Sequence, residues 1–184
     1  LLAVCCVRKV GSVSVYSRTP AHAARFADEM PGAEGVPERI KIEDSARDAA
    51  RGADIICTAT SAASPVLAAS AVAPGTHINA IGSFTPEMVE IDPALVARAR
   101  VVVDQRQAAM AEAGEVIAAV RAGSMAEGDL IELGAIVNGA VPGRTTKEEI
   151  TLFKSVGLAV QDLCAGARAV AEAERAYLGI ELEL

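Results

Sequence analysis

The sequence contains no tryptophan, and aromatic residues make up only 3% of its 184 residues. It also has no uninterrupted apolar run of about 18 residues, the length that a membrane-spanning helix needs. A core poor in rings argues against an aromatic-rich β-sandwich and favours small aliphatic side chains between helices and a sheet. The lack of a long apolar run gives no candidate for a membrane helix, so we expect no membrane partner.

Patterns that bind metals or form disulfides are also absent. The cysteines are Cys5, Cys6, Cys57 and Cys164. None belongs to a CxxC pair, and adjacent cysteines such as Cys5 and Cys6 are poor disulfide partners. The two histidines, His22 and His77, lack the spacing of metal ligands. The sequence therefore predicts free thiols in a reducing, cytoplasmic compartment and no metal site.

Positive charge is in deficit. The chain has 17 Lys and Arg against 24 Asp and Glu, which gives a net charge of −7 and a pI near 4.9. Such a protein is repelled by phosphate backbones, so nucleic acid is not an expected partner. With 52% hydrophobic and 22% charged residues, the chain is predicted to be ordered, and its length suits one domain with an appendage.

The chain opens with an apolar run, LLAVCCV, followed by Arg8 and Lys9. A signal peptide has its basic residues before the apolar run, not after it. We interpret residues 1–7 as the end of a helix that begins upstream.

Short β-type runs alternate with helical runs in the first half. Strands are predicted at residues 12–17, 54–58, 76–81 and 100–104, and helices at 20–30, 46–51 and 93–99. Pro20 suits a first helical position. Asp44 and Ser45 can both cap the helix at 46–51, and Asp92 caps the helix at 93–99. Apolar strands that alternate with helices predict a doubly wound, mostly parallel α/β sheet with helices on both faces.

The second half has a different pattern. A helix is predicted at residues 107–122 with a weak point at Gly114, and a short strand at 150–153. From Val156 the apolar residues follow helical spacing, which predicts a long amphipathic helix that ends near Gly179.

Ligands of doubly wound sheets bind at the carboxyl ends of the strands. The first such end carries Ser17, Arg18 and Thr19 and no carboxylate. A carboxylate there would bind the ribose hydroxyls of NAD, whereas a guanidinium between two hydroxyls suits a 2′-phosphate. This motif indicates NADP(H) as the preferred cofactor, with NAD(H) as the alternative; an exposed arginine in an ordinary turn would look the same.

Small and polar residues follow two further strands, namely Thr58, Ala59 and Thr60 after one and Gly82 and Ser83 after the other. Such ends let a flat cofactor approach the backbone, although ordinary polar loops have the same composition. No GxGxxG motif opens a helix after a first strand. We therefore expect the first strand of the sheet and its glycine loop upstream of Leu1.

Residues 13–177 resemble the ornithine cyclodeaminase and mu-crystallin family. The most specific stretches are NAIGSFTPEM, VVVDQRQAAMAEAGE and TLFKSVGLAVQD, in the expected order. Members are NAD(P)-dependent, with a Rossmann domain set between two parts of a substrate and dimerisation domain. The resemblance thus implies a partial Rossmann domain at 1–123, lacking its first strand, and a C-terminal segment at 124–184 that packs back toward the second domain of a homodimer.

The resemblance also implies roles for the strand-end residues. The cofactor side comprises Ser17, Arg18, Thr19, Thr58, Ala59, Thr60, Gly82 and Ser155, and the substrate side comprises Ser83 and Phe84. Catalytic residues are not assigned, because the Arg and Lys residues that hold the substrate carboxylate in the family would lie upstream.

The resemblance implies an NAD(P)-dependent oxidoreductase of a small imine or amino acid, such as a pyrroline-2-carboxylate-type ketimine reductase or an amino-acid dehydrogenase. Alternatives are an ornithine cyclodeaminase, a non-catalytic NADPH- or ligand-binding protein, and an inactive fragment. Ornithine cyclodeaminases carry an Asp in the turn where this chain has Phe84, which favours the reductase. Without a first strand, the 184-residue chain alone is expected to be inactive.

Overall fold

The computed structural model describes residues 1–33 and 35–180 and contains two parallel sheets. The strands are β1 (Val13–Val15), β2 (Ile40–Ile42), β3 (Ile55–Thr58), β4 (His77–Ala80), β5 (Arg100–Val103), β6 (Ile131–Glu132) and β7 (Thr151–Lys154). The α-helices are α1 (Leu2–Val7), α2 (Pro20–Glu29), α3 (Ala46–Ala50), α4 (Pro93–Val96), α5 (Arg106–Glu112), α6 (Gly114–Arg121), α7 (Leu133–Val137) and α8 (Ala159–Arg175). Two 3₁₀ turns, η1 (Ala69–Ala71) and η2 (Glu127–Asp129), complete the elements.

The strand order confirms the predicted doubly wound fold. One sheet has the order β1-β2 and the other β3-β4-β7-β5-β6, and every pair is parallel. In a doubly wound sheet of order 3-2-1-4-5-6, the first strand lies between the second and the fourth. Here β1 and β2 match the second and third strands of that order, and β3 and β4 the fourth and fifth. Beyond β4 the sheet continues with β7, β5 and β6. In that order the first strand lies between the strands that β1 and β3 match, and in this structure β1 and β3 belong to different sheets.

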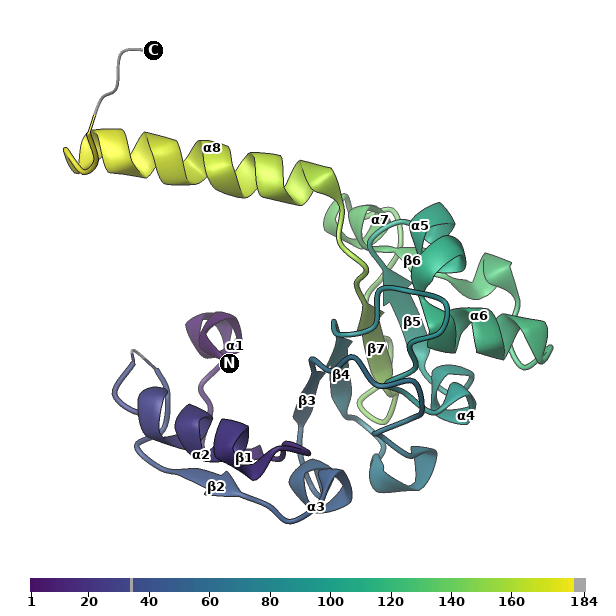
Figure 1. The fold of residues 1–184 in the computed structure, drawn as a ribbon. Coiled ribbons are helices and arrows are strands. Elements are labelled where there is room, and N and C mark those ends of the chain that lie inside the picture. The colour runs from purple at the N-terminus through teal and green to yellow at the C-terminus, as the bar shows by residue number, and fades with distance from the viewer. Residues whose placement is uncertain (34, 181–184) are drawn as a thin grey trace.

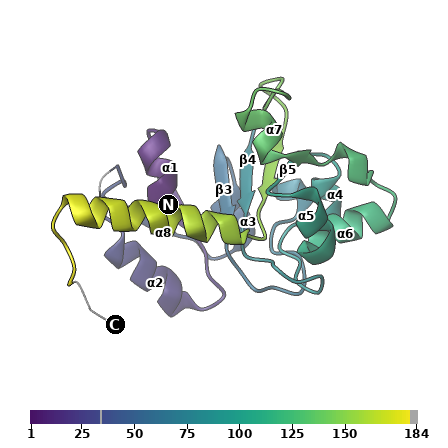
Figure 2. The ribbon, with the colours of Figure 1, turned by 90° about the horizontal axis from the view of Figure 1, so that it is seen from above.

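The five-stranded sheet continues past residue 123, where we expected the C-terminal segment to begin. Both β6 and β7 follow that residue, and β7 lies between β4 and β5. The element that leaves the sheet is α8, which runs away from the end of β7 and passes over the side of the molecule that holds α1 and α2 (Figures 1 and 2). None of the residues of α8 is buried.

The main core lies where the five-stranded sheet meets α4, α5 and α6, which Figure 1 shows beside β5. Ile78, Val101 and Leu152 of the sheet pack in one cluster with Leu95 of α4 and Val116 of α6. The buried hydrophobic residues are all Ala, Val, Ile or Leu. The core of small aliphatic side chains that the composition predicted is confirmed.

Local signals acted as predicted at several helix ends. The Ser45 hydroxyl accepts a hydrogen bond from the Asp48 amide (3.0 Å), and the Asp92 carboxylate accepts one from the Ala94 amide (2.9 Å). The helical run 107–122 is interrupted between α5 and α6. At Gly114, a Cβ would overlap the carbonyl oxygen of Met88. The predicted weak point is confirmed, and close packing of the 86–88 loop explains it.

The strands and α-helices that were not predicted from the sequence are β2, β6 and α7, of which the last two divide the apolar stretch 130–137. Within the described residues, no helix is both long enough and apolar enough to cross a membrane.

Candidate cofactor and substrate edge of the sheet

Parallel strands bring their carboxyl ends to one edge of the sheet, and this edge collects most of the predicted site residues. The ladder between β3 and β4 ends with the Ile81 amide bonded to the Thr58 carbonyl (3.0 Å). The ladder between β4 and β7 ends with the Ser155 amide bonded to the Ala80 carbonyl (3.1 Å). Residues 58–60, 82–84 and 155 therefore lie on three adjacent strand ends.

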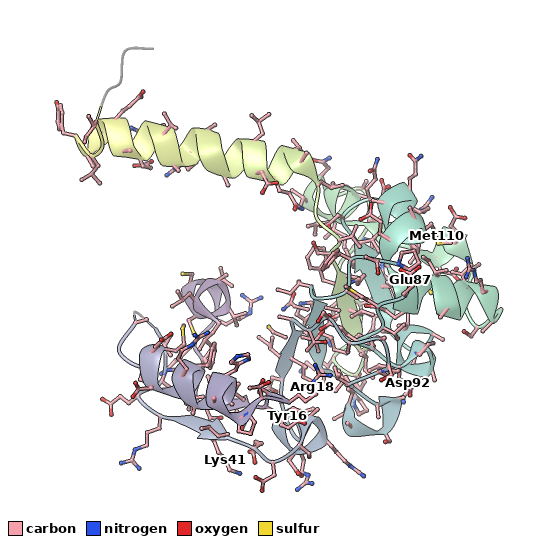
Figure 3. The ribbon with its side chains drawn as sticks, viewed as in Figure 1. Tyr16, Arg18, Lys41, Glu87, Asp92 and Met110 are labelled. Atoms are coloured by element: carbon pink, nitrogen blue, oxygen red, sulfur yellow. The ribbon has the colours of Figure 1, made fainter. Side chains whose placement is uncertain are left out.

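Ser17, Arg18 and Thr19 lie at the end of β1, in the other sheet. The Ser17 hydroxyl accepts a hydrogen bond from the Thr19 amide (3.2 Å). Arg18 is exposed, and Figure 3 shows it with Tyr16 on the side of the two-stranded sheet that faces the rest of the chain. The guanidinium of Arg18 is thus accessible to an anionic group.

Glu90 ties the ends of β3 and β4 together. Its carboxylate is completely buried and accepts hydrogen bonds from the Thr58 hydroxyl (3.1 Å) and the Thr60 amide. It also accepts from the amides of Gly82 (2.8 Å) and Ser83 (3.2 Å). These donors compensate the cost of burying the carboxylate and fix both loops against it.

The two loops approach so closely that only glycine fits at position 82. A Cβ on Gly82 would overlap the backbone of Thr60 and would also crowd the carboxylate of Glu90. This contact accounts for the glycine without any cofactor. The cofactor-side role of Gly82 stays a prediction.

Ser83 faces the interior, although we expected it on the substrate side. The residue is completely buried, and its hydroxyl donates to the Glu115 carboxylate (2.7 Å) and accepts from the Lys154 ammonium (2.7 Å). Lys154 and Glu115 are themselves paired at 3.4 Å. The neighbouring Phe84, in contrast, is 54% exposed. Its substrate-side role stays a prediction.

Ser155 is held by Asp104, which follows β5. One oxygen of the Asp104 carboxylate accepts from the Ser155 hydroxyl (2.6 Å) and from the amides of Val156 (3.0 Å) and Gly157 (3.1 Å). The other oxygen accepts from the Gln161 amide group (3.1 Å). Asp104 therefore fixes the connection between β7 and α8, and its carboxylate is not available at the 82–84 turn.

Sequence reasoning missed Glu90, Glu115 and Lys154. Each is a charged residue within or beside an apolar run, as in GEVIAAV for Glu115 and TLFK for Lys154. A charge on the buried face of a predicted element was the available signal, because such a charge must find a partner inside the protein.

His77 lies at the opposite, amino end of β4. Its Nδ1 lies 2.7 Å from the Thr151 hydroxyl and its Nε2 lies 3.3 Å from the Asn79 side-chain oxygen. Burial lowers the pKa of His77 from its ordinary value, the Asn79 hydrogen bond raises it, and the charge of Arg144 lowers it further. Within the described residues, no group of three or more His, Cys, Asp or Glu could hold a metal ion.

A doubly wound parallel sheet whose strand ends are small and polar is a fold of the Rossmann class. The family model described as "Ornithine cyclodeaminase/mu-crystallin family" matches residues 1–176. The chain belongs to this family, as its resemblance predicted.

Individual family members are similar over nearly the whole chain. A Δ1-pyrroline-2-carboxylate reductase of Bacillus cereus is 42% identical over 163 residues, which are 88% of this chain and 49% of that protein. The Thermococcus litoralis Δ1-pyrroline-2-carboxylate reductase in complex with NADH and L-proline is 37% identical, with a TM-score of 0.91 over 98% of this chain and 55% of that one. An archaeal alanine dehydrogenase dimer with bound NAD is 31% identical, with a TM-score of 0.86 over 99% of this chain and 55% of that one. The chain thus spans about half the length of the curated relatives it matches.

Proposed function

We propose that the chain forms most of the cofactor-binding domain of an NAD(P)H-dependent imine reductase that acts on Δ1-pyrroline-2-carboxylate or a similar cyclic ketimine. This proposal rests on the likeness of the chain to a reductase described with NADH and L-proline. The likeness extends over 98% of the chain, with a TM-score of 0.91. An enzyme of this kind reduces the C=N bond of the imine and yields an amino acid.

The residues at the sheet edge fit a nicotinamide cofactor. Ala59 and Thr60 are exposed beyond β3, and Ser155 is fixed in place by Asp104. A bound nicotinamide supplies a hydride from its C4 atom. This chain would hold the nicotinamide ring and exclude water from it on the side of Phe84. The exposed phenyl ring of Phe84 offers an apolar surface to the substrate.

The preference for NADP(H) is a separate proposal. The two solved relatives are described with NADH and NAD, so the preference depends on Ser17, Arg18 and Thr19 alone. Arg18 is exposed and can pair with a 2′-phosphate, and no carboxylate stands in these three positions.

The turn at residues 82–84 favours a reductase over a cyclodeaminase. Cyclodeamination of ornithine requires a second amine to attack the imine, and a carboxylate near the reaction centre can orient that amine and accept its proton. Phe84 can do neither. The carboxylates of Glu90, Glu115 and Asp104 lie nearby but are occupied by hydrogen bonds inside the protein.

We also propose a homodimer in which α8 belongs to the substrate and dimerisation part. Val160, Leu163 and Val170 of this helix are 56%, 71% and 59% exposed. An apolar helix face of this kind is normally covered, and the archaeal alanine dehydrogenase is described as a dimer. Sedimentation of the protein with its natural ends would test the assembly.

The function is tested by assaying the protein with its natural ends for NADPH-dependent and NADH-dependent reduction of Δ1-pyrroline-2-carboxylate. A parallel assay measures proline formation from ornithine with catalytic NAD. We expect ketimine reduction and little cyclodeamination. Proline formation from ornithine without ketimine reduction would contradict the proposal. Binding of NADPH without turnover of either substrate would instead support a binding protein.

A further inference from the structure

Lys154 and Glu115 form an ion pair that is completely shielded from water, since neither side chain has any exposed surface. Removing two charges from water costs free energy that their mutual attraction often fails to recover, and apolar pairs of similar size can give equal or higher stability. Stability alone therefore does not explain this pair. What an apolar pair could not supply is the set of directed hydrogen bonds that the two groups make.

Those hydrogen bonds converge on the turn that follows β4. The Lys154 ammonium donates to the carbonyls of Ser83 (2.6 Å) and Ala80 (3.3 Å) and to the Ser83 hydroxyl (2.7 Å). Glu115 accepts from the same hydroxyl (2.7 Å). Lys154 of β7 thus binds both ends of the segment 80–83, and Glu115 of α6 holds the Ser83 hydroxyl in this arrangement.

The turn at residues 81–84, which this ion pair holds, carries exposed apolar side chains. Ile81 is 53% exposed and Phe84 is 54% exposed, while Ser83 between them is anchored inward. Lys154 is also the direct chain neighbour of Ser155, whose amide bonds to the Ala80 carbonyl (3.1 Å). The ion pair therefore fixes the substrate-side turn relative to the residue expected beside the nicotinamide.

We propose that Lys154 and Glu115 are positioning residues that hold the 81–84 turn and Ser155 in one relative geometry, so that the substrate imine meets the nicotinamide at hydride-transfer distance. The proposal rests on the reductase function proposed above. Both side chains are buried, so they act through the turn and do not touch the substrate. Displacement of a reacting group by about 1 Å can lower a rate roughly a hundredfold. An ion pair that fixes the 81–84 turn can therefore affect the rate of hydride transfer.

The test replaces the pair by apolar residues of similar length, in the variant Lys154→Met/Glu115→Met of the protein with its natural ends. The matched control is Lys147→Met/Glu148→Met, which changes the same residue types at exposed positions before β7, at the opposite edge of the sheet. Ser83→Ala keeps both charges and removes their shared hydroxyl, and it serves if the double variant fails to fold.

Three measurements separate positioning from a merely structural role. They are amide hydrogen exchange of the peptide that contains residues 81–84, kcat and KM for Δ1-pyrroline-2-carboxylate, and the primary isotope effect with NADPH deuterated at C4. We expect exchange in the turn to rise while the α6 amides stay protected. We expect kcat to fall roughly tenfold or more, with an increased isotope effect because hydride transfer becomes slower. The control should match the unchanged protein.

Loss of folded protein alone would lower the rate per milligram and leave KM, the isotope effect and exchange in the 81–84 turn unchanged, and that result would overturn the proposal. If the unchanged protein does not reduce the imine, the reductase function is wrong. The exchange measurement then decides separately whether the pair fixes the turn, and unchanged exchange would overturn that part as well.

Discussion

The ammonium of Lys154 lies 2.6 Å from the carbonyl oxygen of Ser83, so a side chain of the central strand β7 closes the turn after its neighbour β4. Comparable links occur along the whole edge. Glu90 joins the ends of β3 and β4, and Asp104 joins the ends of β5 and β7. The Glu132 carboxylate at the end of β6 accepts a hydrogen bond from the amide of Arg106, just after β5 (2.9 Å). A charged side chain thus links the ends of each pair of adjacent strands in the five-stranded sheet.

Removal of only one charge of the buried pair should be strongly destabilising. We expect Lys154→Met to lower the free energy of unfolding by roughly 3–5 kcal/mol, because it leaves the Glu115 carboxylate buried without its counter-ion. Lys154→Met/Glu115→Met should be closer to the unchanged protein. Urea unfolding measures both. A double variant that is less stable than the single one would show that the pair itself stabilises the fold.

Gly82→Ala should destabilise the protein because a methyl group would collide with the backbone of Thr60. Backbone atoms cannot move aside as the end of a flexible side chain can, so we expect a loss of roughly 1–3 kcal/mol. Gly134→Ala is the control, since a Cβ there meets no atom and the residue lies in α7. Alanine is favoured over glycine within helices, so the control should be neutral or stabilising by up to about 1 kcal/mol. Thermal unfolding of the two variants compares them.

His77 should make the protein less stable in mild acid. Its pKa is lowered in the folded protein, chiefly by burial, from the ordinary value of 6.5. Between that value and the lower folded value, the unfolded chain binds more protons, so stability falls as the pH decreases through this window. Above pH 6.5 the effect is absent. His77→Gln should flatten this dependence in unfolding curves measured across the window.

The control for that experiment is His22→Gln, because His22 is exposed on α2. It should leave the slope of stability against pH unchanged. An equal change in slope for both variants would show that the histidine at the start of β4 is not the cause.

Much of the fold could be predicted because the signals are local. Apolar strands, proline at the start of α2 and caps such as Ser45 and Asp92 depend on neighbouring residues only. The place of β7 could not be predicted, since the sequence order of strands does not state their order in the sheet. β2 was missed because its sequence, Ile-Lys-Ile, is short and two of its residues are exposed.

The candidate site also has a part that could be predicted from the sequence and a part that could not. Arg18 was assigned to the cofactor side from its place at a strand end, and Phe84 to the substrate side from the family resemblance. Both residues are exposed, and their roles stay predictions. Ser83 was expected on the substrate side because the family resemblance places this turn beside the substrate. Its inward orientation depends on Lys154 and Glu115, which are distant in sequence, and only the folded chain brings them together.

Arg18→Ala should weaken the binding of NADPH far more than that of NADH. A charge-assisted pair with a phosphate contributes roughly 1.5–3 kcal/mol, which corresponds to about tenfold to a hundredfold in affinity. The side chain is exposed, so the smaller value is expected, and salt should reduce it further. Fluorescence titration of both cofactors against the protein with its natural ends measures the two dissociation constants.

Arg25→Ala on α2 is a suitable control, since Arg25 is exposed and pairs weakly with Glu29 (3.9 Å). It should leave both affinities unchanged. A guanidinium that reads the 2′-phosphate has no partner in NADH, so the ratio of the two dissociation constants is the decisive quantity. An equal loss for NADPH and NADH in Arg18→Ala would mean that Arg18 contacts a part common to both cofactors, and the preference for NADP(H) would then lack its basis.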